Sequence, residues 1–393
     1  MRRKQNIPQL RFSEFDDIWN FEYGENIFRS VSNKSHNSDL PILAITQEFG
    51  AIPRDLIEFK ISVTDKSVES YKVVEVGDYI ISLRSFQGGI EFSNYYGICS
   101  PAYIILKPIV EIDRLYFKFY FKTERYIKQI TKNLEGIRDG KMISFKYFSD
   151  AGLNFPSLPE QTKIANFLTS VDEKLNQLKK KKSLLERYKK GVMQKIFSQE
   201  LRFKDDDGNE FADWEEKKLG DIGDVKMCRR IFNEETLPDS DIPFYKIGSF
   251  GKKADAYISK ELYLDYRKRF SFPKKGDILI SAAGTIGRTV VYDGEDAYYQ
   301  DSNIVWIDND NSIVSNDFLF FILQIVKYNT EGGTIQRLYN NSLKSTKFHH
   351  PSLFEQTKIA KFLSAIDDKI QNCNFQIEKM ELWKKGLLQK MFV

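Results

Sequence analysis

The stretch Pro156-Ser-Leu-Pro-Glu-Gln-Thr-Lys-Ile-Ala-Asn-Phe-Leu168 occurs a second time as Pro351-Ser-Leu-Phe-Glu-Gln-Thr-Lys-Ile-Ala-Lys-Phe-Leu363. The alignment continues without a gap, at an offset of 195 residues, to Phe197 and Phe392, and 20 of its 42 positions are identical. Agreement of this extent indicates an internal duplication, which we take as the organising feature of the chain.

The segments that precede the two copies are also related, but only at a few anchors. Leu10-Arg11-Phe12 matches Leu201-Arg202-Phe203, and Gly77-Asp78 before an apolar run matches Gly276-Asp277. The chain therefore has the order A–B–A′–B′, in which B and B′ are near copies while A and A′ share a scaffold and differ elsewhere. We expect the four segments at residues 1–155, 156–199, 200–350 and 351–393.

Each B segment is predicted to be one long helix. Ser157 with Glu160, and Ser352 with Glu355, have the spacing of a capping box, in which the Glu side chain reaches back to the backbone N–H of the Ser. Apolar residues then recur at alternating spacings of four and three, which is typical of a coiled coil. The predicted helix-pairing seam comprises Ile164, Leu168, Val171, Leu175, Leu178, Leu185, Ile359, Leu363, Ile366, Ile370, Ile377 and Met380.

The predicted helices have the length of a spacer. A helix of about 36 residues spans roughly 54 Å, and two such helices packed antiparallel would hold the two A segments at opposite ends. DNA half-sites one turn apart are separated by about 34 Å, which is of the same order. Gly191 and Gly386 occupy equivalent positions, where a glycine either ends a helix or allows a neighbouring helix to approach closely.

The A segments have an α+β pattern. Short β-rich runs follow the Gly-Asp turns, and each segment then has one apolar helical stretch, at residues 113–133 and 315–329. A polar loop that contains glycine follows each stretch. We therefore expect an α+β fold, with two α/β domains separated by two long antiparallel coiled-coil helices in a pseudo-two-fold arrangement.

Composition excludes several classes of protein. The three cysteines are far apart, the three histidines have no metal-ligand spacing, and no apolar stretch is long enough to span a membrane. The net charge of +4 permits nucleic acid as a partner without requiring it. The glycines between Ala283 and Thr289 lack the spacing of a phosphate-binding loop, and no motif of a methyltransferase or hydrolase occurs. We expect a cytoplasmic protein without a metal site.

These features together resemble the specificity subunits of Type I restriction–modification enzymes. The duplicated Pro-Ser-Leu-x-Glu-Gln-Thr-Lys-Ile-Ala-x-Phe-Leu blocks carry the resemblance, supported by Pro8-Gln-Leu-Arg-Phe12, Gly276-Asp-Ile-Leu-Ile-Ser-Ala-Ala-Gly-Thr-Ile-Gly-Arg288 and Ser100-Pro-Ala-Tyr-Ile-Ile-Leu-Lys107. It covers essentially the whole chain. The resemblance implies that each A segment is a target-recognition domain for one half of a split, asymmetric site in double-stranded DNA.

The resemblance also implies the partners. The paired B helices would dock two DNA adenine methyltransferase subunits, and two restriction subunits would then join. The chain itself would be non-catalytic and without cofactor, since S-adenosylmethionine, ATP and Mg would be bound by those partners. Two other readings stay open: a duplicated coiled-coil scaffold that binds only protein, and the specificity module of a methylation-only system.

The two A segments differ where base contacts are expected. Ser82-Leu-Arg-Ser-Phe-Gln-Gly-Gly89 stands where the second segment has Ser281-Ala-Ala-Gly-Thr-Ile-Gly-Arg288. Arg, Asn and Gln side chains read base edges, and Lys contacts phosphates. The predicted DNA-binding residues are Arg84, Ser85, Gln87, Arg138 and Lys141 for one half-site, and Thr285, Arg288, Gln336, Arg337, Asn340 and Asn341 for the other.

Overall fold

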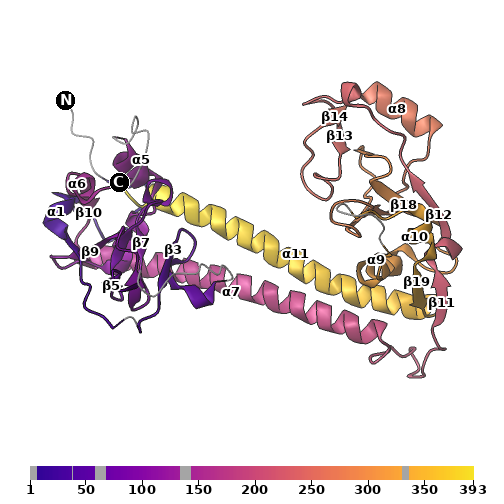
Figure 1. The fold of residues 1–393 in the computed structure, drawn as a ribbon, viewed down its shortest axis with the longest axis horizontal. Coiled ribbons are helices and arrows are strands. Elements are labelled where there is room, and N and C mark those ends of the chain that lie inside the picture. Colours follow the sequence, from indigo (N-terminus) through magenta and orange to yellow (C-terminus); the bar gives the residue numbers. More distant parts are fainter. Residues whose placement is uncertain (1–6, 38, 58–67, 133–142, 330–335) are drawn as a thin grey trace. The chain divides into compact units, whose positions relative to one another are not determined.

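The chain forms two compact units in a computed structural model (Figure 1), which describes residues 7–37, 39–57, 68–132, 143–329 and 336–393. The first unit contains the described residues up to Lys182 together with Cys373–Val393, and the second contains Ser183–Asn372. Both long helices, α7 (Leu158–Phe197) and α11 (Leu353–Lys390), are divided between the units. The heptad pattern therefore predicted both helices, with ends within a few residues of those observed.

In the first unit, the beginning of α7 packs antiparallel against the end of α11. Asp172 forms an ion pair with Lys384, and Lys179 forms one with Glu381, so that a later residue of α7 meets an earlier residue of α11. In the second unit, Lys189 of α7 donates to the carboxylate of Asp367 of α11 at 2.7 Å. None of the helices that the described residues form is both long and apolar enough to cross a bilayer.

The predicted seam residues are all turned away from solvent. Leu185, Ile370, Ile377 and Met380 are half-buried, and the other members are buried. Residues of both helices are also members of the two hydrophobic cores. Ile164 and Leu168 belong to the first core together with Leu387 and Met391. In the same way, the beginning of α11 and the end of α7 share the second core. Each core is thus completed by the start of one helix and the end of the other.

The first unit is built around a four-stranded antiparallel sheet in the order β2-β9-β6-β7. Its strands are β2 (Phe28–Val31), β9 (Ile104–Pro108), β6 (Tyr79–Ile81) and β7 (Glu91–Phe92). Three strand pairs accompany it: β1 (Asn20–Tyr23) with β10 (Gly152–Phe155), β3 (Leu43–Thr46) with β4 (Gly50–Pro53), and β5 (Lys72–Val74) with β8 (Gly97–Cys99). The helices are α1 (Gly24–Ile27), α3 (Ser85–Gly88), α4 (Arg114–Tyr120), α5 (Glu124–Thr131) and α6 (Phe145–Ser149).

The second unit repeats this plan with the sheet order β12-β18-β15-β16. Its strands are β12 (Gly223–Met227), β18 (Ile304–Asn309), β15 (Ile278–Ser281) and β16 (Thr289–Val291). The pair of β11 (Glu215–Lys218) with β19 (Lys347–His350) corresponds to β1 with β10, and a three-stranded sheet joins β14 (Tyr257–Ile258), β13 (Ile242–Tyr245) and β17 (Tyr298–Tyr299). The helices are α8 (Lys260–Arg269), α9 (Asn316–Ile325) and α10 (Asn340–Ser345).

Two local predictions need correction. The stretch at 113–133 contains two helices, α4 and α5, because the Thr123 hydroxyl caps a new helix by accepting from the Tyr126 N–H. The capping-box prediction is confirmed for Ser352, whose hydroxyl accepts from the Glu355 N–H at 3.5 Å, but it is wrong for both glutamates. Instead of reaching back, the Glu160 carboxylate accepts two hydrogen bonds from Arg11, each of 2.8 Å, and the Glu355 carboxylate accepts from Arg202.

Candidate nucleic-acid interface

The same turn introduces an inner strand of each four-stranded sheet, β6 in the first and β15 in the second. Gly77 and Gly276 have φ values of +89° and +91°, a backbone conformation that favours glycine. The next residue, Asp78 or Asp277, is buried, and its carboxylate accepts from the backbone N–H three residues earlier at 2.8 Å. Burial raises the pKa of Asp78 to about 6 and also raises the pKa of Asp277. The turn is thus a shared structural device, and the loop after each strand is where the units diverge.

Loop 1, residues 82–89, follows β6 and contains the short helix α3. The buried Ser85 hydroxyl accepts from the Ser82 N–H at 2.8 Å, so that this side chain holds the turn and faces inward. Arg84 and Gln87 are exposed on the same loop. Of the residues predicted for the first half-site, Arg84 and Gln87 therefore present their side chains to solvent. Arg138 and Lys141 lie outside the described residues.

Loop 2, residues 281–288, follows β15 and has a different internal structure. The Ser281 hydroxyl accepts from the Arg288 N–H at 2.9 Å and donates to the Thr285 carbonyl, which closes the loop on itself. Gly284 and Gly287 have positive φ values, as a tight turn of this kind requires. Thr285 is exposed, whereas Arg288 is half-buried and donates to the Phe250 carbonyl at 2.9 Å. Arg288 is therefore tied to the domain at its guanidinium.

A second segment lies beside loop 2. Arg337 pairs with Ala283 in an isolated β-bridge, and the Leu338 N–H donates to the Ala282 carbonyl at 2.9 Å. The structure thus brings Ala283 of loop 2 and Arg337 together although they are far apart in the sequence. Gln336 precedes the bridge and is exposed, and α10 begins shortly after it with the exposed residues Asn340 and Asn341.

The guanidinium of Arg337 is held in a defined position. Its Nη2 donates to the Ser302 hydroxyl at 2.7 Å and to the Asn303 side-chain oxygen at 3.2 Å. It lines a polar hollow together with Arg230, Ile231, Gln300, Asp301, Ser302 and Asn303. A tethered arginine has lost much of its side-chain freedom before a ligand arrives, which lowers the entropic cost of binding.

Arg230 and its neighbours were not among the predicted DNA-binding residues. Arg230 is exposed, its Nε lies 3.9 Å from the Asp301 carboxylate, and its guanidinium lies 5.5 Å from the centre of the Phe232 ring. Arg229 similarly lies over Phe270. The adjacent arginines beside an aromatic residue were the available signal, since basic residues interleaved with aromatics are typical of nucleic-acid surfaces.

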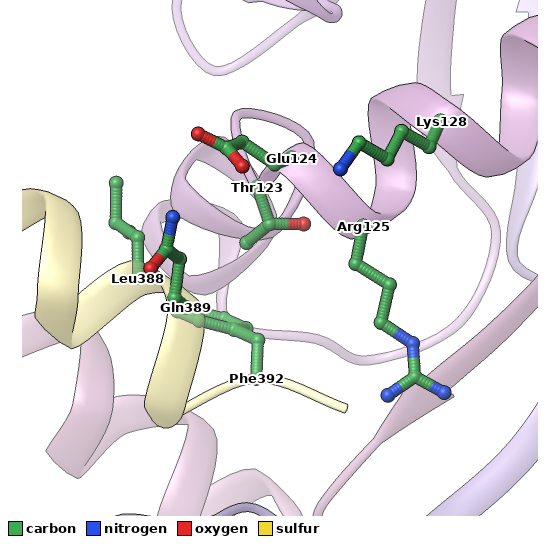
Figure 2. A pocket seen from close by; sticks show the side chains of 7 residues that line it. All are labelled: Thr123, Glu124, Arg125, Lys128, Leu388, Gln389 and Phe392. Carbon is green, nitrogen blue, oxygen red and sulfur yellow. The ribbon is translucent and has the colours of Figure 1, made fainter.

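Another hollow is lined by none of the predicted DNA-binding residues. Figure 2 shows it where α5 begins beside the end of α11, lined by Thr123, Glu124, Arg125, Lys128, Leu388, Gln389 and Phe392. The Glu124 carboxylate pairs with Lys385 at 3.0 Å, and this interaction lowers the pKa of Glu124. The ion pair joins α5 to α11, so we assign this hollow to packing. Within the described ranges, no three His, Cys, Asp or Glu side chains are grouped closely enough to hold a metal ion.

Comparison with known proteins identifies the family. The model of the Type I restriction modification DNA specificity domain matches residues 10–187 and again residues 212–381. The chain belongs to the Type I restriction–modification DNA specificity family. It has two specificity domains, and the specificity subunits of such systems are non-catalytic DNA-recognition components.

Individual relatives agree with this family assignment. A putative type I restriction enzyme specificity subunit of Haemophilus influenzae is 58% identical over 151 residues, which are 38% of this chain and 39% of that protein. The putative MjaX specificity subunit of Methanocaldococcus jannaschii is 27% identical over 98% of this chain and 95% of its own length. The crystal structure of the Type I S subunit of M. genitalium has the same fold, with a TM-score of 0.59 at 16% identity over 98% of this chain and 99% of that one.

Proposed function

We propose that this specificity subunit reads a bipartite, asymmetric DNA site, with one half-site for each domain. One observation carries the proposal: the same sheet and the same Gly-Asp turn support two loops that differ in sequence, internal bonding and exposed side chains. A shared scaffold with different loops fits one mode of approach to DNA and two different base sequences. Unequal half-sites make the site asymmetric.

The second domain supplies the better defined surface. Arg337 and Arg230 line one polar hollow, and Thr285 is exposed on loop 2, to which Arg337 is joined by its bridge with Ala283. Arginine pairs with the O6 and N7 atoms of guanine in the major groove, and Asn and Gln amides pair with adenine. We infer that the hollow receives base edges of one half-site. In the first domain, Arg84 and Gln87 supply the corresponding side chains from loop 1.

The long helices present surfaces for protein partners. Leu382 and Phe375 of α11 are exposed, and so are Leu184 and Tyr188 of α7. Gly191 and Gly386 lie inside the helices, where glycine costs about 1 kcal/mol relative to alanine. A Cβ at either glycine would meet nothing within 4 Å among the described residues, so packing within the chain does not require glycine. Close approach of a helix from a partner protein would explain why glycine occupies both positions.

We infer that these helices dock two DNA adenine methyltransferase subunits, and that two restriction subunits join that assembly. S-adenosylmethionine, ATP and Mg would then be bound by the partners, and the specificity subunit would supply position and sequence selection. We place the complex in the cytoplasm, where it meets DNA and its partners.

The decisive experiment is long-read methylome sequencing of a methylation-free host that expresses the chain with its methyltransferase subunit. We expect methylated adenines within a motif of two unlike half-sites separated by a gap of fixed length. A motif without two parts would refute the proposal. A gel-shift assay of the same complex that showed no preference over random duplex would favour a purely protein-binding scaffold.

A further inference from the structure

The junction between each domain and its helix is a polar joint made by the Glu-Gln pair of the duplicated block. In the first unit, Glu160 is paired with Arg11, which also donates to the Asp17 carbonyl at 2.7 Å. The neighbouring Gln161 accepts from the Asp113 N–H at 3.0 Å and donates to the Pro156 carbonyl at 2.9 Å. The first turn of α7 is therefore bonded to two separate segments of the domain.

The second unit has the same joint. Glu355 is paired with Arg202, which also donates to the Ala212 carbonyl at 2.7 Å. Gln356 accepts from the Ser315 N–H at 2.9 Å and donates to the Ile313 and Pro351 carbonyls. Glu160, Gln161, Glu355 and Gln356 are all at most 2% exposed. The joints therefore match although the loops of the two domains do not.

In the first unit, helix α4 links the joint to loop 1. Asp113, which is bonded to Gln161, is the N-cap of α4 and accepts from the Tyr116 N–H. At the other end of α4, Lys122 donates to the Gly88 carbonyl at 2.9 Å. A Cβ at Gly89 would lie 2.0 Å from the Phe121 carbonyl oxygen, so the loop backbone rests directly on the end of the helix.

In the second unit, helix α9 occupies the same place between the joint and loop 2. Ser315, which is bonded to Gln356, is the N-cap of α9. Just beyond the other end, the Tyr328 hydroxyl donates to the Leu323 carbonyl at 2.8 Å. The ring of Tyr328 lies against loop 2, because a Cβ at Gly287 would come within 2.7 Å of it.

We propose that Gln161 and Gln356, with the Arg11–Glu160 and Arg202–Glu355 pairs, are positioning residues that fix each loop relative to its spacer helix. They thereby set the gap between half-sites with single-base-pair accuracy. This inference rests on the proposed function. Helix length sets the approximate gap. The joint, acting through α4 or α9, then prevents each loop from shifting relative to its spacer helix.

The physical reason is directionality. The apolar core that also joins each helix to its domain gives attraction without a preferred orientation. Bidentate Arg–carboxylate pairs and hydrogen bonds to backbone groups have narrow geometric preferences. A change of one base pair moves a half-site by about 3.4 Å along the DNA axis, which is larger than the tolerance of these bonds.

The test uses the methylome of the complete complex. Gln161→Met and Gln356→Met keep side-chain length and remove the polar bonds. We expect methylation of sites whose gap differs by one base pair to rise about tenfold over wild type, which corresponds to about 1.4 kcal/mol. The letters within each half-site should stay unchanged, which separates positioning from base reading. A general loss of stability would lower methylation at all sites without creating a new gap.

The matched controls are Lys163→Gln and Lys358→Gln. These lysines join the same helices to the same N-terminal segments through ion pairs with Glu14 and Asp206 that are more exposed. We expect the wild-type gap from both. If a Gln→Met variant fails to fold, Arg11→Lys keeps the charge and loses the bidentate geometry, and it should show an intermediate relaxation.

The outcomes distinguish the two proposals. A bipartite wild-type motif whose gap stays fixed in Gln161→Met, Gln356→Met and Arg11→Lys would overturn the role of the joint and leave the proposed function intact. A wild-type motif without two half-sites would overturn the proposed function itself.

Discussion

Individual side chains in the second domain divide into those that hold loop 2 and those that face outward. Ser281 and Arg288 are bonded within the domain and hold loop 2, whereas Thr285 is exposed. Arg337 is also bonded within the domain, to Ser302 and Asn303, and it lines the hollow as well. Residue type alone could not separate these groups, because Arg288 and Arg337 have the same side chain. Their hydrogen-bond partners, Phe250 for Arg288 and Asn303 for Arg337, lie 38 and 34 residues away in the sequence and become known only from the tertiary fold.

Replacing Arg337 tests the reading of the second half-site. Arg337→Ala removes a pre-oriented guanidinium from the polar hollow, and we expect a loss of about 1–3 kcal/mol in discrimination at one base position. The methylome should show that position relaxed in the second half-site. The first half-site serves as the internal control, and unchanged preference at every position would exclude Arg337 as a base-reading residue.

Asp78 gives a prediction for pH dependence. Its pKa in the folded chain, about 6, lies above the ordinary value because burial penalises the charged form. The folded state therefore holds this proton more firmly than the unfolded state. The stabilisation that Asp78 contributes is fully present below pH about 4. It is lost as the pH rises through about 6, and the total loss in the free energy of unfolding is up to about 3 kcal/mol.

Asp78→Asn keeps an acceptor for the Glu75 N–H and removes the titration. Denaturant unfolding of the full chain between pH 4 and 7 should show that the variant loses less stability than wild type as the pH increases. Parallel pH profiles for the two proteins would show that Asp78 titrates in its ordinary range.

Within the long helices, the sequence pattern was sufficient to predict position and length. Heptad spacing is a local property, so α7 and α11 begin and end close to the expected residues. The partners of Glu160 and Glu355 were not predictable in this way, because Arg11 and Arg202 lie 149 and 153 residues away. A local capping motif and a long-range ion pair compete for the same carboxylate, and only the tertiary fold decides between them.

Leu363 tests the contribution of the seam. Leu363 lies on α11 and is completely buried in the second core. Leu363→Ala should therefore lower the free energy of unfolding by about 2–5 kcal/mol. Leu382→Ala, on the same helix but 72% exposed, should change it by less than about 0.5 kcal/mol. Urea unfolding of both variants makes the comparison, and equal effects would mean that seam burial does not govern stability.

For the complete chain, the duplicated plan was predictable from repeats, whereas the membership of the two cores was not. The segments at 156–199 and 351–393 were expected to be spacer helices. Both ends of each helix also serve as core elements, because their apolar faces complete the domains that they reach. Periodicity reveals an apolar face without revealing which of several surfaces covers it.

Inserting one heptad into each helix at matching seam positions tests the spacer role. Seven residues add about 10 Å of helix, so the methylated motif should acquire a gap longer by about 3 base pairs. Inserting the heptad into α7 alone should abolish methylation, because the paired seams then fall out of register. A doubled insertion that retained the wild-type gap would contradict the proposal that helix length determines the gap.

The division of α11 between the units also has a consequence for biosynthesis. Residues 373–393 emerge from the ribosome after the entire second unit, yet Leu387 and Met391 are buried in the first core. The first unit is therefore translated with part of its apolar core uncovered. That part stays uncovered until the end of α11 has been synthesised. Chaperone binding to nascent chains should accordingly persist on the first unit after the second has become protease-resistant.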